Sequence, residues 1–146
     1  MSGTRPRDKA FLCGPNFVRG VRVALLLVVE DDPQVLVLAE SVLKDAGHKV
    51  LTATNYDGAI ALLADGKSPD LALLDHNLGE GLTGIDVAKS AQTYRKDMAF
   101  IYTSGDHISD GTRALFVEGG EFLPKPYTPE QLLEMVDRLL AGSANV

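Results

Sequence analysis

The stretch "LLLVVEDDPQ", residues 25–34, combines an apolar run with a cluster of acids and a proline. The aliphatic residues complete an apolar stretch over residues 21–29, rich in β-branched side chains, which is typical of a strand buried on both faces of a sheet. Asp32 is suited to cap a helix, and Pro33 fits the first helical turn. The stretch therefore predicts a strand followed by a helix over residues 33–46, the first βα unit of an α/β fold.

The same alternation continues along the rest of the chain. Apolar runs predict further strands over residues 49–54, 70–75, 98–104 and 120–124, and helical spacing predicts helices over residues 57–63, 85–94, 107–118 and 129–140. Five strands alternating with five helices imply a doubly wound parallel sheet, with helices on both faces and right-handed crossovers. We expect an irregular arm over residues 1–20, one domain over residues 21–141, and a short tail over residues 142–146 with no effector domain.

Composition limits the classes of function. A chain of 146 residues fits one domain and is long enough to bury roughly 70% of the surface that its unfolded form exposes. The net charge of -6 argues against a direct nucleic-acid surface, which is normally basic. The single cysteine, Cys13, cannot form an internal disulfide, and no apolar run reaches the roughly 20 residues of a membrane span. Because the chain also lacks a secretory signal pattern, we expect a cytoplasmic protein without a membrane segment.

Polar residues follow the predicted strands at their carboxyl ends, where open α/β sheets bind their ligands. Three carboxylates, two hydroxyls and one ammonium occupy these positions: Glu30, Asp31, Asp75, Thr103, Ser104 and Lys125. Each has an ordinary explanation when taken alone, for example a solvated loop acid or a turn residue. Together they suit a hard divalent cation and a phosphoryl group, since Mg²⁺ prefers oxygen ligands and keeps several waters.

The motifs "VVEDD", "LLDHN", "YTSG" and "FLPKPYTP" occur in this order at the ends of four predicted strands. Over residues 21–141 the chain thereby resembles the receiver domains of two-component response regulators. This resemblance implies the flavodoxin-like strand order 2-1-3-4-5. It also implies Asp75 as the phospho-acceptor, with Glu30, Asp31 and the backbone carbonyl of Asn77 as further ligands of Mg²⁺.

The resemblance assigns roles on the other side of the acceptor as well. Lys125 would pair with the phosphoryl oxygens, and Phe122 matches the aromatic residue that rearranges in the family's switch. A hydroxyl from the fourth strand would close on the phosphoryl group. Ser104 is preferred for this role because Gly105 follows it, with Thr103 as the alternative.

The loop after Asp75 departs from the family's pattern. Many receivers carry a Met-Pro pair where this chain has Leu78 and Gly79, and Gly84 comes one residue later than their glycine. The implied partners are a histidine kinase or a histidine phosphotransfer protein as donor, and a downstream protein target. A homodimer is compatible with this, and no enzyme activity is implied beyond the receiver's own phosphorylation and dephosphorylation.

Two alternatives stay open. The segment "GEGLTG" matches the dinucleotide-binding pattern through Gly79, Gly81 and Gly84, with Asp106 about 20 residues further on. However, the loop begins several residues after the strand, and Asp75 would repel a pyrophosphate. The other alternative is a receiver fold that acts as an interaction scaffold without phosphorylation, against which the complete set of site residues argues.

Overall fold

The computed structural model describes residues 23–79 and 81–144, so the arm predicted over residues 1–20 lies outside the described residues. The fold is one sheet of five parallel strands in the order β2-β1-β3-β4-β5. The strands are β1 (Leu25–Val29), β2 (Lys49–Ala53), β3 (Leu71–Asp75), β4 (Ala99–Ser104) and β5 (Glu121–Pro124). The sequence pattern predicted the doubly wound sheet, and the strand order is the one that the resemblance to receiver domains implies.

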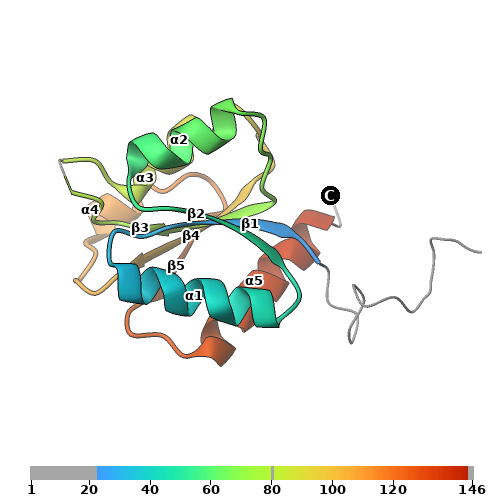
Figure 1. Cartoon of the computed structure of the whole chain (residues 1–146). Helices are drawn as coiled ribbons and strands as arrows, with labels where there is room; N and C mark the ends of the chain where they lie inside the picture. The colour runs from blue at the N-terminus through green and yellow to red at the C-terminus, as the bar shows by residue number, and fades with distance from the viewer. Residues whose placement is uncertain (1–22, 80, 145–146) are drawn as a thin grey trace, which may run out of the picture.

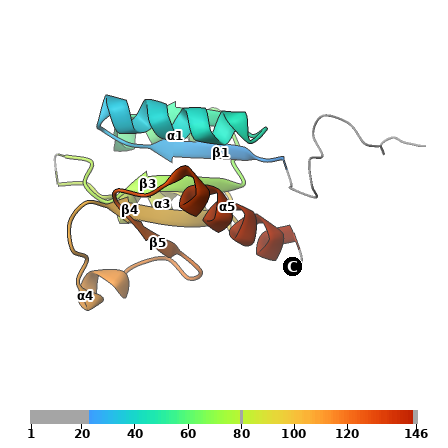
Figure 2. The same cartoon turned by 90° about the horizontal axis from the view of Figure 1, so that it is seen from below.

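Helices cover both faces of this sheet (Figure 1). They are α1 (Pro33–Asp45), α2 (Tyr56–Ala64), α3 (Gly84–Gln92), α4 (Asp110–Arg113) and α5 (Pro129–Ala144). One buried cluster joins α2 and α3 to the sheet, and a second cluster joins α1 and α5 to the opposite face. Figure 2 shows α5 lying beside the sheet and the short α4 on the β5 side.

The central strands are buried because their side chains alternate between the two clusters. In β1, Leu27 and Val29 belong to the cluster under α2 and α3, whereas Leu26 and Val28 belong to the cluster under α1 and α5. All five residues of β3 are buried. Strands that contribute apolar side chains to both faces read as continuous apolar runs, which is why the sequence predicted them well.

Side-chain caps fix where the helices begin. Asp32 caps α1 as expected, since its Oδ1 accepts a hydrogen bond from the backbone N–H of Gln34 at 2.9 Å. At the start of α3, Thr83 and Asp86 form a capping box, in which each side chain accepts from the other residue's backbone N–H.

Two helix predictions were wrong in length. The helix predicted over residues 107–118 is only α4, Asp110–Arg113, because Ser109 caps its first turn and the chain beyond it turns to pack against Tyr102. Gly111 also disfavours a longer helix. In contrast, α5 continues to Ala144 instead of ending at residue 140, since Gly142 weakens a helix without necessarily ending it.

Candidate functional site

Strand alternation brings four polar side chains to one face of the sheet. In each of the strands β1, β3, β4 and β5, the last apolar residue of the cluster under α1 and α5 is followed two positions later by a polar residue. Side chains two apart in a strand share a face. The residues placed in this way are Glu30, Asp75, Thr103 and Lys125. The sequence predicted that they converge, and the sheet order explains why.

Carboxylates form a compact group at this edge of the sheet. Oxygens of Glu30, Asp31 and Asp75 all lie within 4.8 Å of one another. Glu30 and Asp75 are only 3% and 4% exposed, whereas Asp31 is exposed. Hard oxygen donors at this spacing fit Mg²⁺, and the exposed carboxylate leaves an open side for the waters that Mg²⁺ retains.

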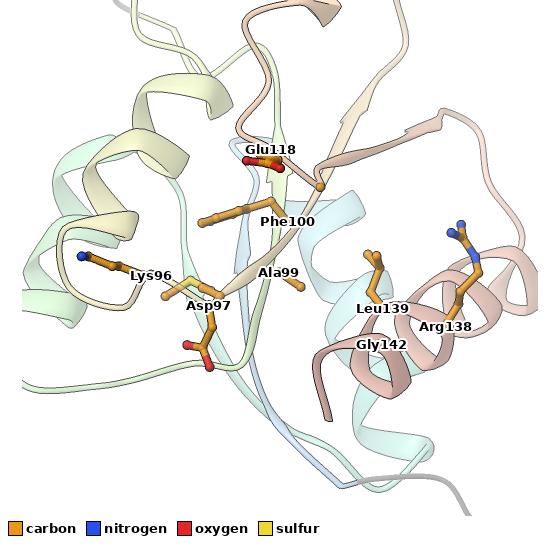
Figure 3. A pocket seen from close by; sticks show the side chains of 10 residues that line it. Lys96, Asp97, Ala99, Phe100, Glu118, Arg138, Leu139 and Gly142 are labelled. Atoms are coloured by element: carbon orange, nitrogen blue, oxygen red, sulfur yellow. The ribbon is translucent and has the colours of Figure 1, made fainter. Parts of the chain in front are cut away.

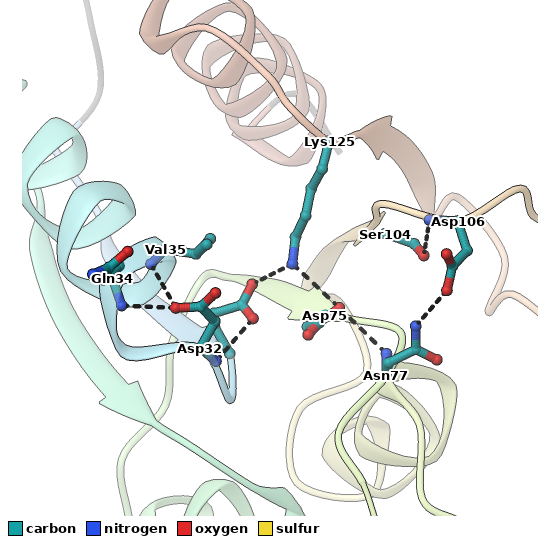
Figure 4. A network of polar contacts seen from close by, with 9 residues as sticks. Asp32, Gln34, Val35, Asp75, Asn77, Ser104, Asp106 and Lys125 are labelled. Atoms are coloured by element: carbon teal, nitrogen blue, oxygen red, sulfur yellow. Dashed lines mark hydrogen bonds and ion pairs between the residues drawn. The ribbon is translucent and has the colours of Figure 1, made fainter.

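Lys125 reaches across the site from the end of β5 (Figure 4). Its Nζ lies 2.8 Å from Oε1 of Glu30 and 3.5 Å from Oδ1 of Asp75. Burial lowers the pKa of Lys125, but the contacts with these two carboxylates outweigh burial and raise it. One ammonium therefore faces two buried carboxylates, which leaves excess negative charge for a cation to neutralise.

Asp75 has an unusual environment for a carboxylate. Burial, followed by the neighbouring Glu30, raises the pKa of Asp75 to about 7, although Lys125 and the backbone N–H of Asn77 oppose this increase. Tyr127 lies near the same charges. Burial, together with Glu30 and Asp75, raises the pKa of Tyr127 to about 12, so its phenol stays neutral.

The loop after β3 is tied to both β3 and the loop after β4. The backbone N–H of Asn77 donates to Oδ1 of Asp75 at 3.3 Å, and the Asn77 side-chain amide donates to Oδ2 of Asp106 at 3.2 Å. Asp106 was not predicted from the sequence as part of this site, because its contact with Asn77 joins loops that are far apart along the chain. Gly84 packs closely on β3, since a Cβ at this position would lie 2.8 Å from the carbonyl oxygen of Asp75.

The two candidate hydroxyls differ in their surroundings. Thr103 pairs with Asp75 in the β3–β4 register, and its buried Oγ1 has no hydrogen-bond partner among the described residues. Ser104 follows Tyr102 onto the opposite face by strand alternation. Its Oγ accepts a hydrogen bond from the backbone N–H of Asp106 at 3.0 Å.

Phe122 does not join the acidic group. It is partly buried against the cluster under α2 and α3, on the face opposite Asp75. Its ring centroid lies 6.5 Å from that of Phe116, and the guanidinium of Arg113 lies 4.8 Å from the Phe122 centroid. The structure thus places this aromatic beside α4 and not beside the candidate acceptor.

A cavity of about 440 Å³ lies at the other end of the sheet, beside the start of β4 (Figure 3). Phe100 and Leu139 are among its apolar lining residues, while Lys96 and Glu118 contribute opposite charges. This mixed lining does not select a ligand by charge. The acidic group lies outside this cavity, at the carboxyl ends of the strands.

Comparison with known proteins agrees with this geometry. A sequence model of the response regulator receiver domain matches residues 26–137. The chain belongs to the response regulator receiver family. Response regulator SaeR from Staphylococcus aureus is 29% identical over 116 residues, which are 79% of this chain and 50% of that protein. The receiver thus spans about half the length of this relative.

Solved receiver structures show the same fold. A response regulator receiver protein from Sinorhizobium medicae is 29% identical with a TM-score of 0.77, and the match covers 83% of this chain and 97% of that one. A receiver domain protein from Methanospirillum hungatei has a TM-score of 0.76 at 24% identity, with coverage of 84% and 98%. Among the described residues, no helix of this receiver is both long and apolar enough to cross a bilayer.

The glycines of the dinucleotide alternative have backbone explanations in this fold. Gly79 and Gly81 both have φ of 78°, a conformation that favours glycine, and Gly84 leaves room for the backbone of β3. The receiver fold therefore accounts for all three glycines without a nucleotide.

Proposed function

We propose that this receiver accepts a phosphoryl group on Asp75 from a phosphohistidine of a histidine kinase or phosphotransfer protein. Glu30, Asp31, Asp75 and the backbone carbonyl of Asn77 would hold Mg²⁺, and output would pass through protein contacts in the cytoplasm. The observation that carries this proposal is the placement of Asp75, which is buried between the Lys125 ammonium and two further carboxylates. Membership of the receiver family supports the same role.

The transfer requires an ionised Asp75 facing the donor. One carboxylate oxygen forms a bond to phosphorus as the bond between phosphorus and the imidazole nitrogen breaks, and the imidazole leaves with that electron pair. Bound Mg²⁺ would neutralise charge on the carboxylate and on the incoming phosphoryl group. Lys125 contributes a point charge on a long side chain, which can follow the charge as it moves from the carboxylate to the phosphoryl oxygens.

A hydroxyl at the end of β4 would then bind the new phosphoryl oxygens. The register opposite Asp75 and the unpartnered Oγ1 favour Thr103 for this role over Ser104, whose Oγ already accepts a hydrogen bond from the backbone N–H of Asp106. A small shift of this strand end would bias the following loop between two states. We also propose Phe122 as the aromatic residue that rearranges when Asp75 is phosphorylated.

The test is mass measurement after incubation with acetyl phosphate, a small phosphodonor, and Mg²⁺. We expect the wild-type protein to gain one phosphate and Asp75→Asn to gain none. Asp65→Asn is a matched control, because Asp65 is an exposed acid at the end of α2, and it should gain phosphate normally. Absence of phosphate on the wild type, or its persistence in Asp75→Asn, would contradict the proposal.

A further inference from the structure

Tyr102 holds the segment after α4 against β4. It is the largest fully buried side chain of residues 23–79 and 81–144, with 0% exposure. Its ring stacks on Phe116 with centroids 4.0 Å apart and an interplanar angle of 19°. Its hydroxyl accepts a hydrogen bond from the backbone N–H of Val117 at 3.2 Å. A Cβ on Gly120 would lie 2.6 Å from Cε2 of the same ring, so the backbone there packs tightly against it.

These contacts join β4 to the segment after α4, which lies about 15 residues further along the chain. Stacking of two aromatic rings stabilises their contact beyond the burial of apolar area, and the hydrogen bond to the Val117 N–H adds to this. Phe116 also lies beside Phe122 on β5, with the two rings tilted and their centroids 6.5 Å apart, and the guanidinium of Arg113 in α4 lies over the Phe122 ring. Tyr102 is therefore the buried anchor of a set of side chains that links β4, α4 and β5.

Tyr102 also lies directly before Thr103, the hydroxyl that pairs in register with Asp75. Successive residues of a strand point to opposite faces of the sheet. We propose that Tyr102 couples phosphorylation of Asp75 to the segment over residues 113–120, by clamping that segment onto β4 from the face opposite Thr103. This inference rests on the proposed function. It assigns a positioning role to a residue other than Phe122.

The coupling follows from close packing. When the Thr103 hydroxyl moves to donate to a phosphoryl oxygen, the main chain that Thr103 shares with Tyr102 moves with it. The close packing of Gly120 on the ring and the hydrogen bond from the Val117 N–H tie the segment to Tyr102, so the segment follows the ring when it moves. Leu115, which is 56% exposed, belongs to this segment, so a shift repositions an apolar side chain on the surface.

The test compares Tyr102→Phe with the wild type by amide hydrogen exchange, with and without beryllofluoride and Mg²⁺ as a phosphoryl mimic. The amides of Phe116 and Gly120 are the probes, because they bond to Arg113 and Val117 carbonyls and not to the tyrosine hydroxyl. We expect the mimic to change their wild-type exchange about tenfold, and by less than about twofold in Tyr102→Phe. Tyr94→Phe, at a half-exposed tyrosine, should behave like the wild type.

A purely structural role would give a different result. Exchange in Tyr102→Phe would then be faster in both states, with the tenfold response to the mimic preserved, and this would overturn the inference. Gly120→Ala, which forces the segment away from the ring, should lose the response in the same way as Tyr102→Phe.

Phosphate gain from acetyl phosphate, measured by mass on the same proteins, separates the two proposals. If the wild type gains phosphate normally but the mimic leaves amide exchange at Phe116 and Gly120 unchanged, only the coupling is contradicted. No gain by the wild type contradicts the proposed function, and the coupling with it. Tyr102→Phe should gain phosphate as the wild type does, because the substitution leaves the acidic group intact.

Discussion

Three consecutive acids end β1, and the structure gives each a different environment. Asp32 is exposed and caps α1, Asp31 is exposed beside the acidic group, and Glu30 is buried against the Lys125 ammonium. A buried carboxylate is tolerated when it is paired and hydrogen-bonded, and Glu30 also accepts from the backbone N–H of Asp32 at 3.2 Å. The residue left with the least compensation is Asp75, whose raised pKa reflects burial and the proximity of Glu30.

This environment predicts how metal-free stability depends on pH. The pKa of Asp75 rises from 3.8 to about 7 on folding, so the folded chain holds a proton that the unfolded chain has released. This contribution to stability is fully present below about pH 4 and is lost as the pH rises through about 7. Asp75→Asn is neutral at every pH. We therefore expect the free energy of unfolding of the wild type, relative to Asp75→Asn, to fall by about 2 kcal/mol between pH 5 and pH 8.

Urea unfolding in the presence of a chelator measures this difference directly. Asp65→Asn is the control. The difference in free energy of unfolding between the wild type and Asp65→Asn should change little between pH 5 and pH 8. The opposite result is that the wild type becomes more stable relative to Asp75→Asn as the pH rises. This would show that folding does not stabilise the protonated form of Asp75.

At the scale of elements, alternation within the strands decides which side chains meet. From the sequence, Ser104 was preferred as the switch hydroxyl because Gly105 follows it, and Thr103 was the alternative, since counting back from Lys125 depends on the loop between β4 and β5. The register of β4 against β3 favours Thr103 in our proposal, since it sets Thr103 opposite Asp75. The loop between β4 and β5 also explains why the helix predicted over residues 107–118 is shorter in the structure. Phe116 and Val117 contact Tyr102, and these tertiary contacts override the local helical spacing.

Substitution of the two hydroxyls tests the register argument. Thr103→Val keeps the shape of the side chain and removes its hydroxyl, so we expect the protein to gain phosphate while the backbone amide signals of Gly105 and Ile108 no longer shift on phosphorylation. Ser104→Ala should retain most of this shift, because its hydroxyl bonds only to the backbone of its own turn. Nuclear magnetic resonance of both variants measures the difference. The reverse pattern would restore Ser104 as the switch hydroxyl.

At the scale of the whole molecule, the sequence predicted what depends on pattern and missed what depends on packing. Continuous apolar runs identified the strands, and the rule that ligands bind at strand carboxyl ends grouped Glu30, Asp75 and Lys125. The contact between Asn77 and Asp106 and the anchoring of the α4–β5 segment by Tyr102 were not predictable, because they join residues 15 to 29 positions apart through side chains with no local pattern.

The acidic group joins the ends of separate strands, so a cation bound there should stabilise the domain as one unit. Binding to the folded state alone adds about 2.7 kcal/mol at a concentration 100 times the dissociation constant, which raises the melting temperature of a domain of this size by several degrees. We expect Mg²⁺ to produce such a rise in the wild type, with the same midpoint by far-ultraviolet circular dichroism and by tyrosine fluorescence.

Asp31→Asn should lose most of this rise, because it removes an oxygen ligand from the group of carboxylates within 4.8 Å. Asp32→Asn is the matched control. It removes a neighbouring negative charge, yet asparagine still caps α1, so both the fold and most of the magnesium effect should persist. Equal loss in the two variants would show that Mg²⁺ responds only to the net charge of this surface. No rise in the wild type would contradict the assignment of the acidic group as a magnesium site, because a ligand specific for the folded state must stabilise it.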